Sequence, residues 1–326
     1  MAASNTFDTT NLGSAVSNTE ELTRGAYLIS PSNSPFYSNT NKSKASSIMP
    51  EWTLDDLDDP DNTPIAEGAD AVAFEDEFKD QARVFNYIQT LQRNPKVTDD
   101  QELVDNAAGV NYAGAVMKAL KELNRDTEKA LLSANARGIS GSVRTSAGLA
   151  DQLSGASGIF PAEYETPANQ VVTGGSAPTE ANVDAVLQSM FDESGEDSSV
   201  RIYGGSAWIQ AFANNTMRLT SATDNYRTQV NLNGEKGVIK NKIRIYEGQF
   251  GTAEVVNLNS KTLTDTTNKD MAYFINPNYV EIKELGGLIQ KELPDLGGGR
   301  RSTIRRKFTL CVKNPRAHAY WDTITA

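Results

Sequence analysis

The stretch QELVDNAAGVNYAGAVMKALKELNRDTEKALLSANA, residues 101–136, carries the strongest structural signal in the chain. It contains no proline, and apolar or small residues recur along it at helical spacing. Asp99 and Asp100 precede it as capping acids, and Gly138 follows it as a stop signal. The pattern predicts one helix of about 33 residues and about 50 Å, two to three times the usual length.

The segments before this helix offer little to bury within one chain. Residues 1–50 are rich in Ser, Asn and Thr and hold few apolar residues, which predicts an extended arm lying on another surface. Residues 82–93 alternate weakly and contain strand-forming side chains, and Asn94-Pro95 ends the pattern. Together with the acidic stretch 51–70 they predict a two-stranded excursion over 51–97, outward through the acids and back through 82–93.

The chain after the helix predicts a compact α+β unit with a central sheet flanked by helices. A glycine-rich stretch, 138–178, leads into two shorter helices, one marked by Val183 to Met190 and one by Ser206 to Asn214. Strand-like segments surround these helices at 200–204, 226–232, 242–248 and 253–258.

The last part of the chain predicts a long hairpin of strands. Two strand-like segments, 272–285 and 288–293, precede the glycine-rich loop PDLGGGRRS, and a third, 303–313, follows it. In the third segment Ile304 and Phe308 lie on one apolar side, which Arg306 interrupts.

Charge is unevenly distributed along the 326 residues. The net charge is −11, and residues 1–80 alone hold fifteen acids and four bases. The last 36 residues reverse the bias, with eight bases and three acids. Such a distribution favours contact between the two ends or between copies of the chain, although two solvated surfaces explain it equally well.

Cysteine and hydropathy patterns exclude several classes of protein. The single cysteine, Cys311, rules out a disulfide within the chain and a zinc cluster. The first residues lack a basic and an apolar region, so we expect no secretory signal. No apolar run approaches the roughly 20 residues that span a bilayer. We therefore expect the protein to act or assemble where it is made, without a membrane.

The acidic stretch EWTLDDLDDPDNTPIAEGAD, residues 51–70, partly matches two metal motifs. DDLDD matches an Asp-Asp-x-x-Asp magnesium motif, and the residues from Asp59 onward match several ligand positions of an EF-hand loop. Pro60 and Pro64 stand against both, because the first motif needs a helix and the second needs glycine at Pro64. The stretch predicts an exposed acidic loop. The alternative from another class is a magnesium- or calcium-dependent enzyme that uses Asp55, Asp56, Asp58, Asp59 and Asp61.

No other residues form a convincing active site, so we predict no catalytic residue, no metal and no cofactor. His318 is the one histidine and has no identifiable partner. The segment LGGGRRST at 296–303 lacks the Gly-Lys-Ser/Thr ending of a phosphate-binding loop, and a strand rather than a helix follows it. The bases at 300–307 lack interleaved aromatic residues, which argues against a dedicated nucleic-acid binder.

Five motifs spread over nearly the whole chain carry a resemblance to known proteins. They are EWTLDDL at 51–57, EGAD at 67–70, Arg83 with Asn86 and Gln89, ELNRDTE at 122–128 and RKFTLCVKNPRAH at 306–318. These motifs and the order of the predicted parts resemble the major capsid proteins of tailed double-stranded DNA phages, which have the Hong Kong 97-type fold. Within that group the chain is similar to one capsid family long catalogued only as a domain of unknown function.

The resemblance implies an α+β subunit with an N-terminal arm, an E-loop, a P-domain with a long spine helix, and an A-domain. The implied boundaries are 1–50 for the arm and first P-domain segment, 51–97 for the E-loop, 98–139 for the spine helix, 140–270 for the A-domain, and 271–326 for long P-domain strands and a C-terminal return.

The resemblance also implies a structural protein and not an enzyme. We expect a major capsid protein that self-assembles into hexamers and pentamers of an icosahedral shell and encloses double-stranded DNA without reading its sequence. Its partners would be further copies, a portal and, where present, decoration or scaffolding proteins. It would reside in the virion after assembly in the host cytoplasm. An encapsulin-like compartment of the same fold, which holds proteins, is the alternative.

Two groups of residues are the predicted subunit contacts. In the loop, the expected anchors and acids are Trp52, Leu57, Asp55, Asp56, Asp58, Asp59 and Glu67. A basic patch on another subunit is the expected partner, and its candidate residues are Arg300, Arg301, Arg305, Arg306 and Lys307. Reversal of Arg305 and Arg306 to Glu is then expected to impair assembly without affecting folding.

Overall fold

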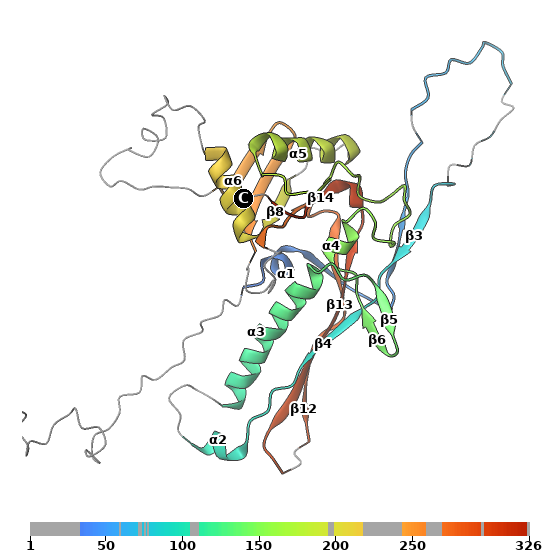
Figure 1. The fold of residues 1–326 in the computed structure, drawn as a ribbon. Helices are drawn as coiled ribbons and strands as arrows, with labels where there is room; N and C mark the ends of the chain where they lie inside the picture. The colour runs from blue at the N-terminus through green and yellow to red at the C-terminus, as the bar shows by residue number, and fades with distance from the viewer. Residues whose placement is uncertain are drawn as a thin grey trace, which may run out of the picture.

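The computed structural model describes residues 33–58, 60–70, 74, 76, 78–104, 111–194, 199–217, 243–258, 269–294 and 297–324. Two sheets form its body, a six-stranded sheet in the upper half and a four-stranded sheet in the lower half of Figure 1. The strand orders are β7-β14-β11-β8-β10-β9 and β1-β12-β13-β4. This mixture of helices and sheets is the predicted α+β class.

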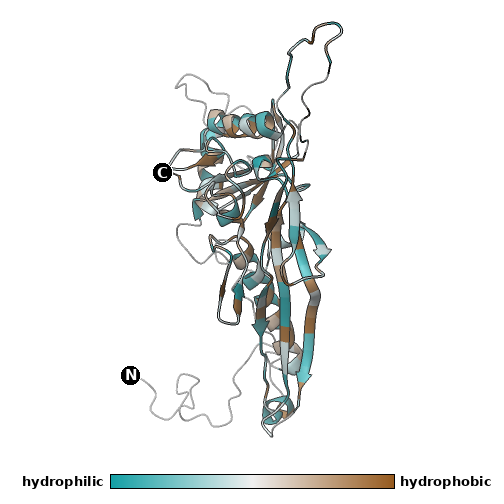
Figure 2. Cartoon of the chain, turned by 90° about the vertical axis from the view of Figure 1, so that its right-hand side faces the viewer, coloured by the Kyte–Doolittle hydropathy of each residue, from teal (hydrophilic) through white to brown (hydrophobic). Residues whose placement is uncertain are grey.

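The four-stranded sheet is built on the predicted long hairpin. β12 (Val280–Leu293) pairs antiparallel with β13 (Arg301–Val312), and both strands carry hydrophobic and hydrophilic residues in turn (Figure 2). β4 (Gln89–Arg93) pairs antiparallel with β13, and β1 (Asn41–Lys44) pairs parallel with β12. The predicted return segment 82–93 therefore ends in this sheet.

β12 contains a bulge opposite the middle of β13. Its register shifts between Glu284 and Leu288, where three residues of β12 lie opposite the single Lys307. Gly286 and Gly287 have φ angles of 75° and 63°, which glycine adopts without the steric cost that a Cβ would bring. The bulge allows both halves of β12 to stay paired with β13.

The segment 272–285, predicted as one strand, forms two strands in different sheets. β11 (Ala272–Ile275) belongs to the six-stranded sheet, and β12 starts at Val280 in the four-stranded sheet. Pro277 lies between them, and the backbone N–H of Tyr279 donates to the carbonyl of Asn276 at 3.2 Å. A proline-containing turn separates the strands, and local alternation did not reveal it.

The six-stranded sheet supports helices on one face and the central core on the other. Its strands are β7 (Val171–Val172), β8 (Val200–Gly204), β9 (Ile245–Gly248), β10 (Gly251–Asn257), β11, and β14 (His318–Trp321). Helices α5 (Glu180–Ser194) and α6 (Ser206–Met217) cover the first face, where Trp208 stacks on Phe212 and meets Trp321 edge to face. Both helices and three of the four predicted strands are confirmed. The predicted strand 226–232 lies outside the described residues.

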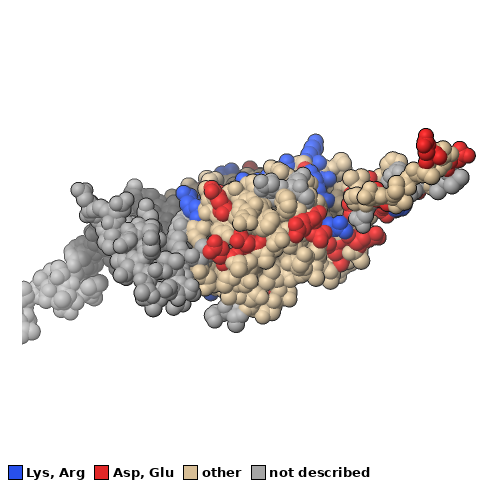
Figure 3. Space-filling model, turned by 90° about the horizontal axis from the view of Figure 1, so that it is seen from above, with Lys and Arg blue, Asp and Glu red and all other residues tan. Residues whose placement is uncertain are grey.

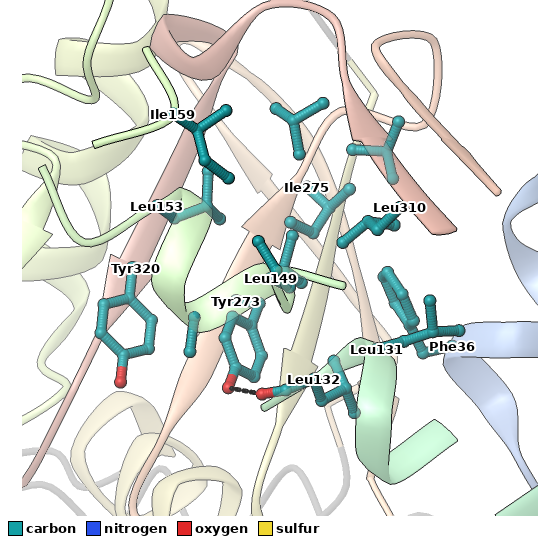
Figure 4. Close-up of a cluster of buried hydrophobic side chains, with 14 of the residues drawn as sticks. Phe36, Leu131, Leu132, Leu149, Leu153, Ile159, Tyr273, Ile275, Leu310 and Tyr320 are labelled. Carbon is teal, nitrogen blue, oxygen red and sulfur yellow. Dashed lines mark hydrogen bonds between the residues drawn. The ribbon is translucent and has the colours of Figure 1, made fainter. Parts of the chain in front are cut away.

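The central core lies between the six-stranded sheet and the long helix (Figure 4). Leu131 and Leu149 are fully buried there, beside side chains from both sheets. The hydroxyl of Tyr273 donates to the carbonyl of Leu132 at 3.0 Å, which satisfies a carbonyl at the end of the helix. This core fixes the two halves of the body to one another.

The predicted helix over 101–136 is wrong as a single element. The structure has a short helix, α2 (Asp99–Leu103), and a 20-residue helix, α3 (Tyr112–Leu131), that would be about 30 Å long. Val104 is extended and ends α2, and the side chain of Asn111 caps α3 by accepting from the backbone N–H of Gly114 at 2.7 Å. Helical spacing continued across this break, so periodicity alone could not locate it. α3 also ends before the predicted stop at Gly138.

Smaller elements complete the described chain. They are α1 (Pro35–Asn39), α4 (Leu149–Gln152), the 3₁₀ helix η2 (Pro315–Ala317), the pair β2 (Glu51–Leu54) and β3 (Ala82–Phe85), and the pair β5 (Gly138–Ser140) and β6 (Val143–Thr145). Across the described ranges, no helix has the length and apolar character needed to cross a bilayer.

The turn between β12 and β13 is fixed against the segment that leads into α2. The backbone N–H of Val97 donates to the carbonyl of Arg300 at 3.0 Å. Gly299 has a φ of 97°, and a Cβ there would lie 2.2 Å from the carbonyl oxygen of Val97. The turn can dock only while residue 299 has no side chain.

We expect Gly299→Ala to loosen this docking at a cost of about 2 kcal/mol, since it adds both backbone strain and a clash with main chain. Hydrogen exchange should show faster exchange at the Val97 amide while the six-stranded sheet stays protected. Gly297→Ala is the matched control, because Gly297 has a φ of 79° but a Cβ on it would meet nothing within 4 Å. Equal exchange in the two variants would show that strain, and not the close approach, is what matters.

Candidate interaction surfaces

A long loop projects from the upper end of the body, beyond the β2–β3 pair (Figure 1). Its large apolar side chains are exposed: Leu57 is 92% exposed, Ile65 83% and Phe74 90%. Every residue of its distal part, the segment 60–70, is exposed, and the loop carries acidic side chains away from the body (Figure 3). A loop that buries so little within its own chain is typical of a segment that docks on a partner.

Three of the predicted contact acids are held by their own chain at the base of the loop. Asp55 accepts from Gln81 Nε2 at 3.0 Å, Asp56 pairs with Arg316 at 3.0 Å, and Asp58 pairs with Lys79 at 2.7 Å. These contacts brace the loop where it leaves the body. Because the three carboxylates turn toward different partners, they do not converge; in the described part of the chain no three His, Cys, Asp or Glu side chains gather as a metal site.

The acids of the distal loop have no such partner. Glu67 and Asp70 are exposed, and Asp61 accepts only from Thr63. Within the described residues none of the three forms an ion pair. Of these three acids, only Glu67 was among the predicted subunit contacts. Asp61 and Asp70 lie in the same acidic stretch but were not predicted as contacts. Asp59, another predicted contact, lies outside the described residues.

The two predicted anchors of the loop differ in their surroundings. Leu57 is exposed, as an anchor for a partner requires. Trp52 lies in β2, is half-buried and packs against the central core of its own chain. Trp52 therefore helps to fix the base of the loop, and it is not a free anchor.

The bases near the hairpin turn divide into paired and unpaired groups. Arg300 forms ion pairs with Glu292 at 3.1 Å and Glu102 at 3.6 Å, and its guanidinium lies 4.2 Å from the ring centre of Tyr112. Arg301 donates to the carbonyl of Pro294 at 2.9 and 2.7 Å, which leaves its charge without an acidic partner among the described residues.

Arg305 and Lys307 complete the exposed part of this surface. The exposed Arg305 donates to Gln92 Oε1 at 2.6 Å, a neutral acceptor that does not cancel its charge. Lys307 is half-exposed opposite Thr90 of β4. The hairpin turn and the acidic loop lie at opposite ends of the molecule (Figure 1), so a contact between them requires two copies of the chain.

The family of the chain explains why such surfaces exist. A family model described as SU10 major capsid protein matches residues 3–325, which is nearly the whole chain. The chain belongs to the SU10 major capsid protein family. Membership makes this capsid protein a component of the virion and a subunit of an oligomeric shell. No curated protein matches it in sequence.

Solved structures confirm the predicted capsid fold. The capsid of a native GTA particle superposes with a TM-score of 0.61 at 11% identity, covering 97% of this chain and 98% of that one. Mycobacterium phage Bobi gives 0.60 at 10% identity, covering 95% and 96%. The SrpI encapsulin complex from Synechococcus elongatus gives 0.52 at 10% identity, covering 94% and 92%. At such identities the similarity shows the Hong Kong 97-type fold alone.

Arg306 of the capsid protein is not on the predicted contact surface. It is 6% exposed, its Nη1 donates to Thr127 Oγ1 at 3.2 Å, and its guanidinium lies 4.6 Å from the ring centre of Tyr37. Arg306 shares the side of β13 on which Ile304 and Phe308 are buried, so it points toward α3. The prediction that its reversal spares folding is therefore wrong, because a carboxylate there would be buried without a partner.

A buried carboxylate on α3 fixes the start of the described chain. Glu128 of α3 accepts from the backbone N–H groups of Phe36 and Tyr37, at 2.9 and 2.7 Å. These donors belong to the first turn of α1, where backbone N–H groups have no acceptor within the helix. Burial raises the pKa of Glu128 to about 7, and the two N–H groups oppose the shift. Glu128 ends the motif ELNRDTE, but only the tertiary contact with α1 reveals its role.

The single histidine and the single cysteine have structural surroundings. His318 is fully buried, and its Nδ1 accepts from the backbone N–H of Asn276 at 3.1 Å. Burial lowers the pKa of His318 to about 3, so the imidazole stays neutral. Burial raises the pKa of the Cys311 thiol to about 12, which keeps it protonated. Neither group has the properties of a nucleophile or a base at neutral pH.

Proposed function

We propose that this capsid protein assembles as hexamers and pentamers into an icosahedral shell that encloses double-stranded DNA. The observation that carries the proposal is the projecting loop, whose large apolar side chains Leu57, Ile65 and Phe74 are exposed and whose distal acids form no ion pair within the described residues. A closed shell needs heterologous contacts, in which one surface of a subunit meets a different surface of the next. The loop and the basic hairpin, at opposite ends of one body, are a pair of that kind.

In this proposal, each domain implied by the resemblance is assigned the helices and strands that lie in its residue range. Residues 1–50 form the arm and first P-domain segment, 51–97 the E-loop, and 98–139 the spine segment, with α3 as the spine helix. The six-stranded sheet with α5 and α6 is the core of the A-domain, which spans 140–270 and also takes β11 and β14. The rest of 271–326 supplies the long P-domain strands β12 and β13.

The proposal extends to partners and place. The protein acts as a structural subunit without catalysis, and a portal and, where present, decoration or scaffolding proteins join it during assembly in the host cytoplasm. DNA is enclosed without sequence recognition. The net charge of −11 suits such a shell, because a strongly basic wall would bind the phosphates of the DNA tightly. Separate contacts that are each weak can hold such a shell together, since many operate at once.

An encapsulin-like compartment is the second candidate, favoured by the similarity to the encapsulin structure at a TM-score of 0.52. The contents of the particle distinguish the two candidates. A shell isolated from its natural source should contain nuclease-protected DNA if it is a phage capsid. A protein cargo without DNA would replace the first proposal by the second.

Assembly itself is tested with the purified chain. We expect negative-stain electron microscopy to show closed shells with hexameric and pentameric units, because every copy carries both contact surfaces. At moderate salt, nearly all of the protein should sediment as a large particle. A chain that stays monomeric under all assembly conditions, and is found in no particle from its source, would overturn the proposal.

A further inference from the structure

Four basic side chains form a row along one side of α3, which we call the cationic row. They follow one another at spacings of three or four residues: Lys118, Lys121, Arg125 and Lys129. The helix packs on β4 and β13 through the side that carries Ala119 and Leu123, and the cationic row lies on the opposite side. The three lysines are exposed and the arginine is half-buried. At 1.5 Å per residue the row is about 17 Å long.

The acids of α3 do not neutralise the cationic row, because all three are engaged elsewhere. Asp126 pairs with Arg93 of β4 at 2.6 Å, and Glu122 lies 3.6 Å from the same guanidinium. Glu128 is buried and accepts from backbone N–H groups of α1. The solvent-facing side of the helix therefore carries one sign of charge.

Neighbouring members of the cationic row repel one another. Residues three or four apart on a helix are adjacent on its surface, so Lys121 lies between Lys118 and Arg125. Like charges at these spacings destabilise a helix. Within the described residues, neither Lys118 nor Lys121 forms an ion pair that would offset the repulsion. An anionic partner lying along the helix would remove this cost.

The composition of the cationic row favours a phosphate backbone over an acidic segment of protein. A protein interface combines charge with apolar area, whereas Met117 is the one large apolar side chain of α3 that is exposed. The exposed Leu57 and Ile65 of the acidic loop would find little to pack on there. A DNA duplex needs no apolar contact, and over about 17 Å it presents about ten phosphates.

We propose that the cationic row of α3 contacts phosphates of the double-stranded DNA inside the shell. The inference rests on the proposed enclosure of DNA, and it names the surface that meets the DNA. Four cations in a chain of net charge −11 make a local contact that does not read sequence. The contact is weak for one subunit, but every subunit of the shell repeats it.

The salt dependence of DNA binding by the unassembled full chain tests the contact. The logarithm of the association constant falls by about 0.9 per neutralised phosphate for each unit in the logarithm of salt concentration, so four cations predict a slope of about −3.6. Lys118→Gln with Lys121→Gln should change the slope to about −1.8 and weaken binding equally for AT-rich and GC-rich duplexes. The thermal midpoint should change little, because both lysines are exposed and Gln has a helix propensity similar to that of Lys.

Two exposed lysines on the other face of the four-stranded sheet provide the matched control. Arg306 points toward α3, so the alternation of β13 turns Arg301 and Thr303 to the opposite face. Lys291 is the register partner of Thr303, and Lys96 lies beside Arg301 in one basic pocket. Lys96→Gln with Lys291→Gln removes the same charge as the test variant and should keep the slope at about −3.6.

Shells assembled in the presence of duplex DNA give a second readout. The test variant should form shells with a yield within about twofold of the unmodified chain, because the cationic row does not join subunits. Its shells should retain less than about half as much DNA after a wash at moderate salt, since each subunit loses two of its four phosphate contacts.

Three results would overturn the inference: an unmodified chain that does not bind duplex DNA at low salt, a test variant that keeps the slope of the unmodified chain, or a control whose slope falls equally. A lower yield of shells from the test variant without DNA would also overturn it and assign the cationic row to a contact between subunits. In all of these cases the proposed function stands if the unmodified chain forms shells that contain DNA. Absence of such shells would count against the proposed function, whereas the slopes would still decide whether the cationic row binds phosphate.

Discussion

Replacing Gly148 with alanine should destabilise the subunit by about 3 kcal/mol or more. Gly148 precedes α4, and a Cβ on it would lie 2.0 Å from the carbonyl oxygen of Ser133 and 2.6 Å from its Oγ. The nearest atom belongs to the main chain, so no rotamer change can relieve the clash. The backbone around residue 148 would have to shift, and this would move Leu149 and Leu153, which are both fully buried in the central core.

Thermal unfolding of the unassembled chain measures this effect. The three tryptophans provide a fluorescence signal, and the midpoint should fall by about 6–12 °C for a chain of this size. Gly138→Ala is the matched control, because a Cβ on Gly138 would meet nothing within 4 Å. A Gly148→Ala variant as stable as this control would mean that the segment after α3 moves more easily than its packing implies.

The second large effect concerns Glu128 and pH. Its folded-state pKa of about 7 lies above the ordinary value of 4.5, so the folded chain holds this proton more tightly than the unfolded chain. Stability from this group is therefore fully present below about pH 4.5 and is lost as the pH rises to about 7. The total loss is on the order of 3 kcal/mol, because each pKa unit corresponds to about 1.4 kcal/mol.

Denaturant unfolding between pH 4.5 and 7.5 checks this dependence. Glu128→Gln cannot ionise, and its stability should lose the part of the pH slope that Glu128 supplies. Glu122→Gln is the matched control, because it makes the same substitution on the same helix at a side chain that is 38% exposed. A slope that survives Glu128→Gln unchanged would assign the pH dependence to other groups.

Elements with a strong local pattern were predictable from the sequence. The segment Val200 to Gly204 is β8 within the predicted bounds, and the helix predicted at Ser206 to Asn214 is α6. The alternation in 303–313 correctly predicted β13 and its buried apolar side. Each of these depends on neighbours within a few residues, which is the range that periodicity reports.

Features set by distant contacts were not predictable in this way. β1 pairs with β12, although the two are more than 200 residues apart in sequence. Arg306 was grouped with exposed bases, but its position on the apolar side of the alternation was a signal that it would be buried against α3. Lys96 was missed as part of the basic surface because only the folded hairpin brings it beside Arg301.

Because of the position of β14 in the six-stranded sheet, this sheet can be completed only late in synthesis of the chain. β14 lies between β7 and β11, and β7 has no other neighbour in the sheet. At the usual rates of translation the ribosome needs on the order of ten seconds to travel from β7 to β14. A nascent chain therefore cannot close this sheet until residues 318–321 have emerged. A chain that ends before residue 318 would leave the edge of β11 unpaired, and an unpaired strand edge is a template for pairing with other chains.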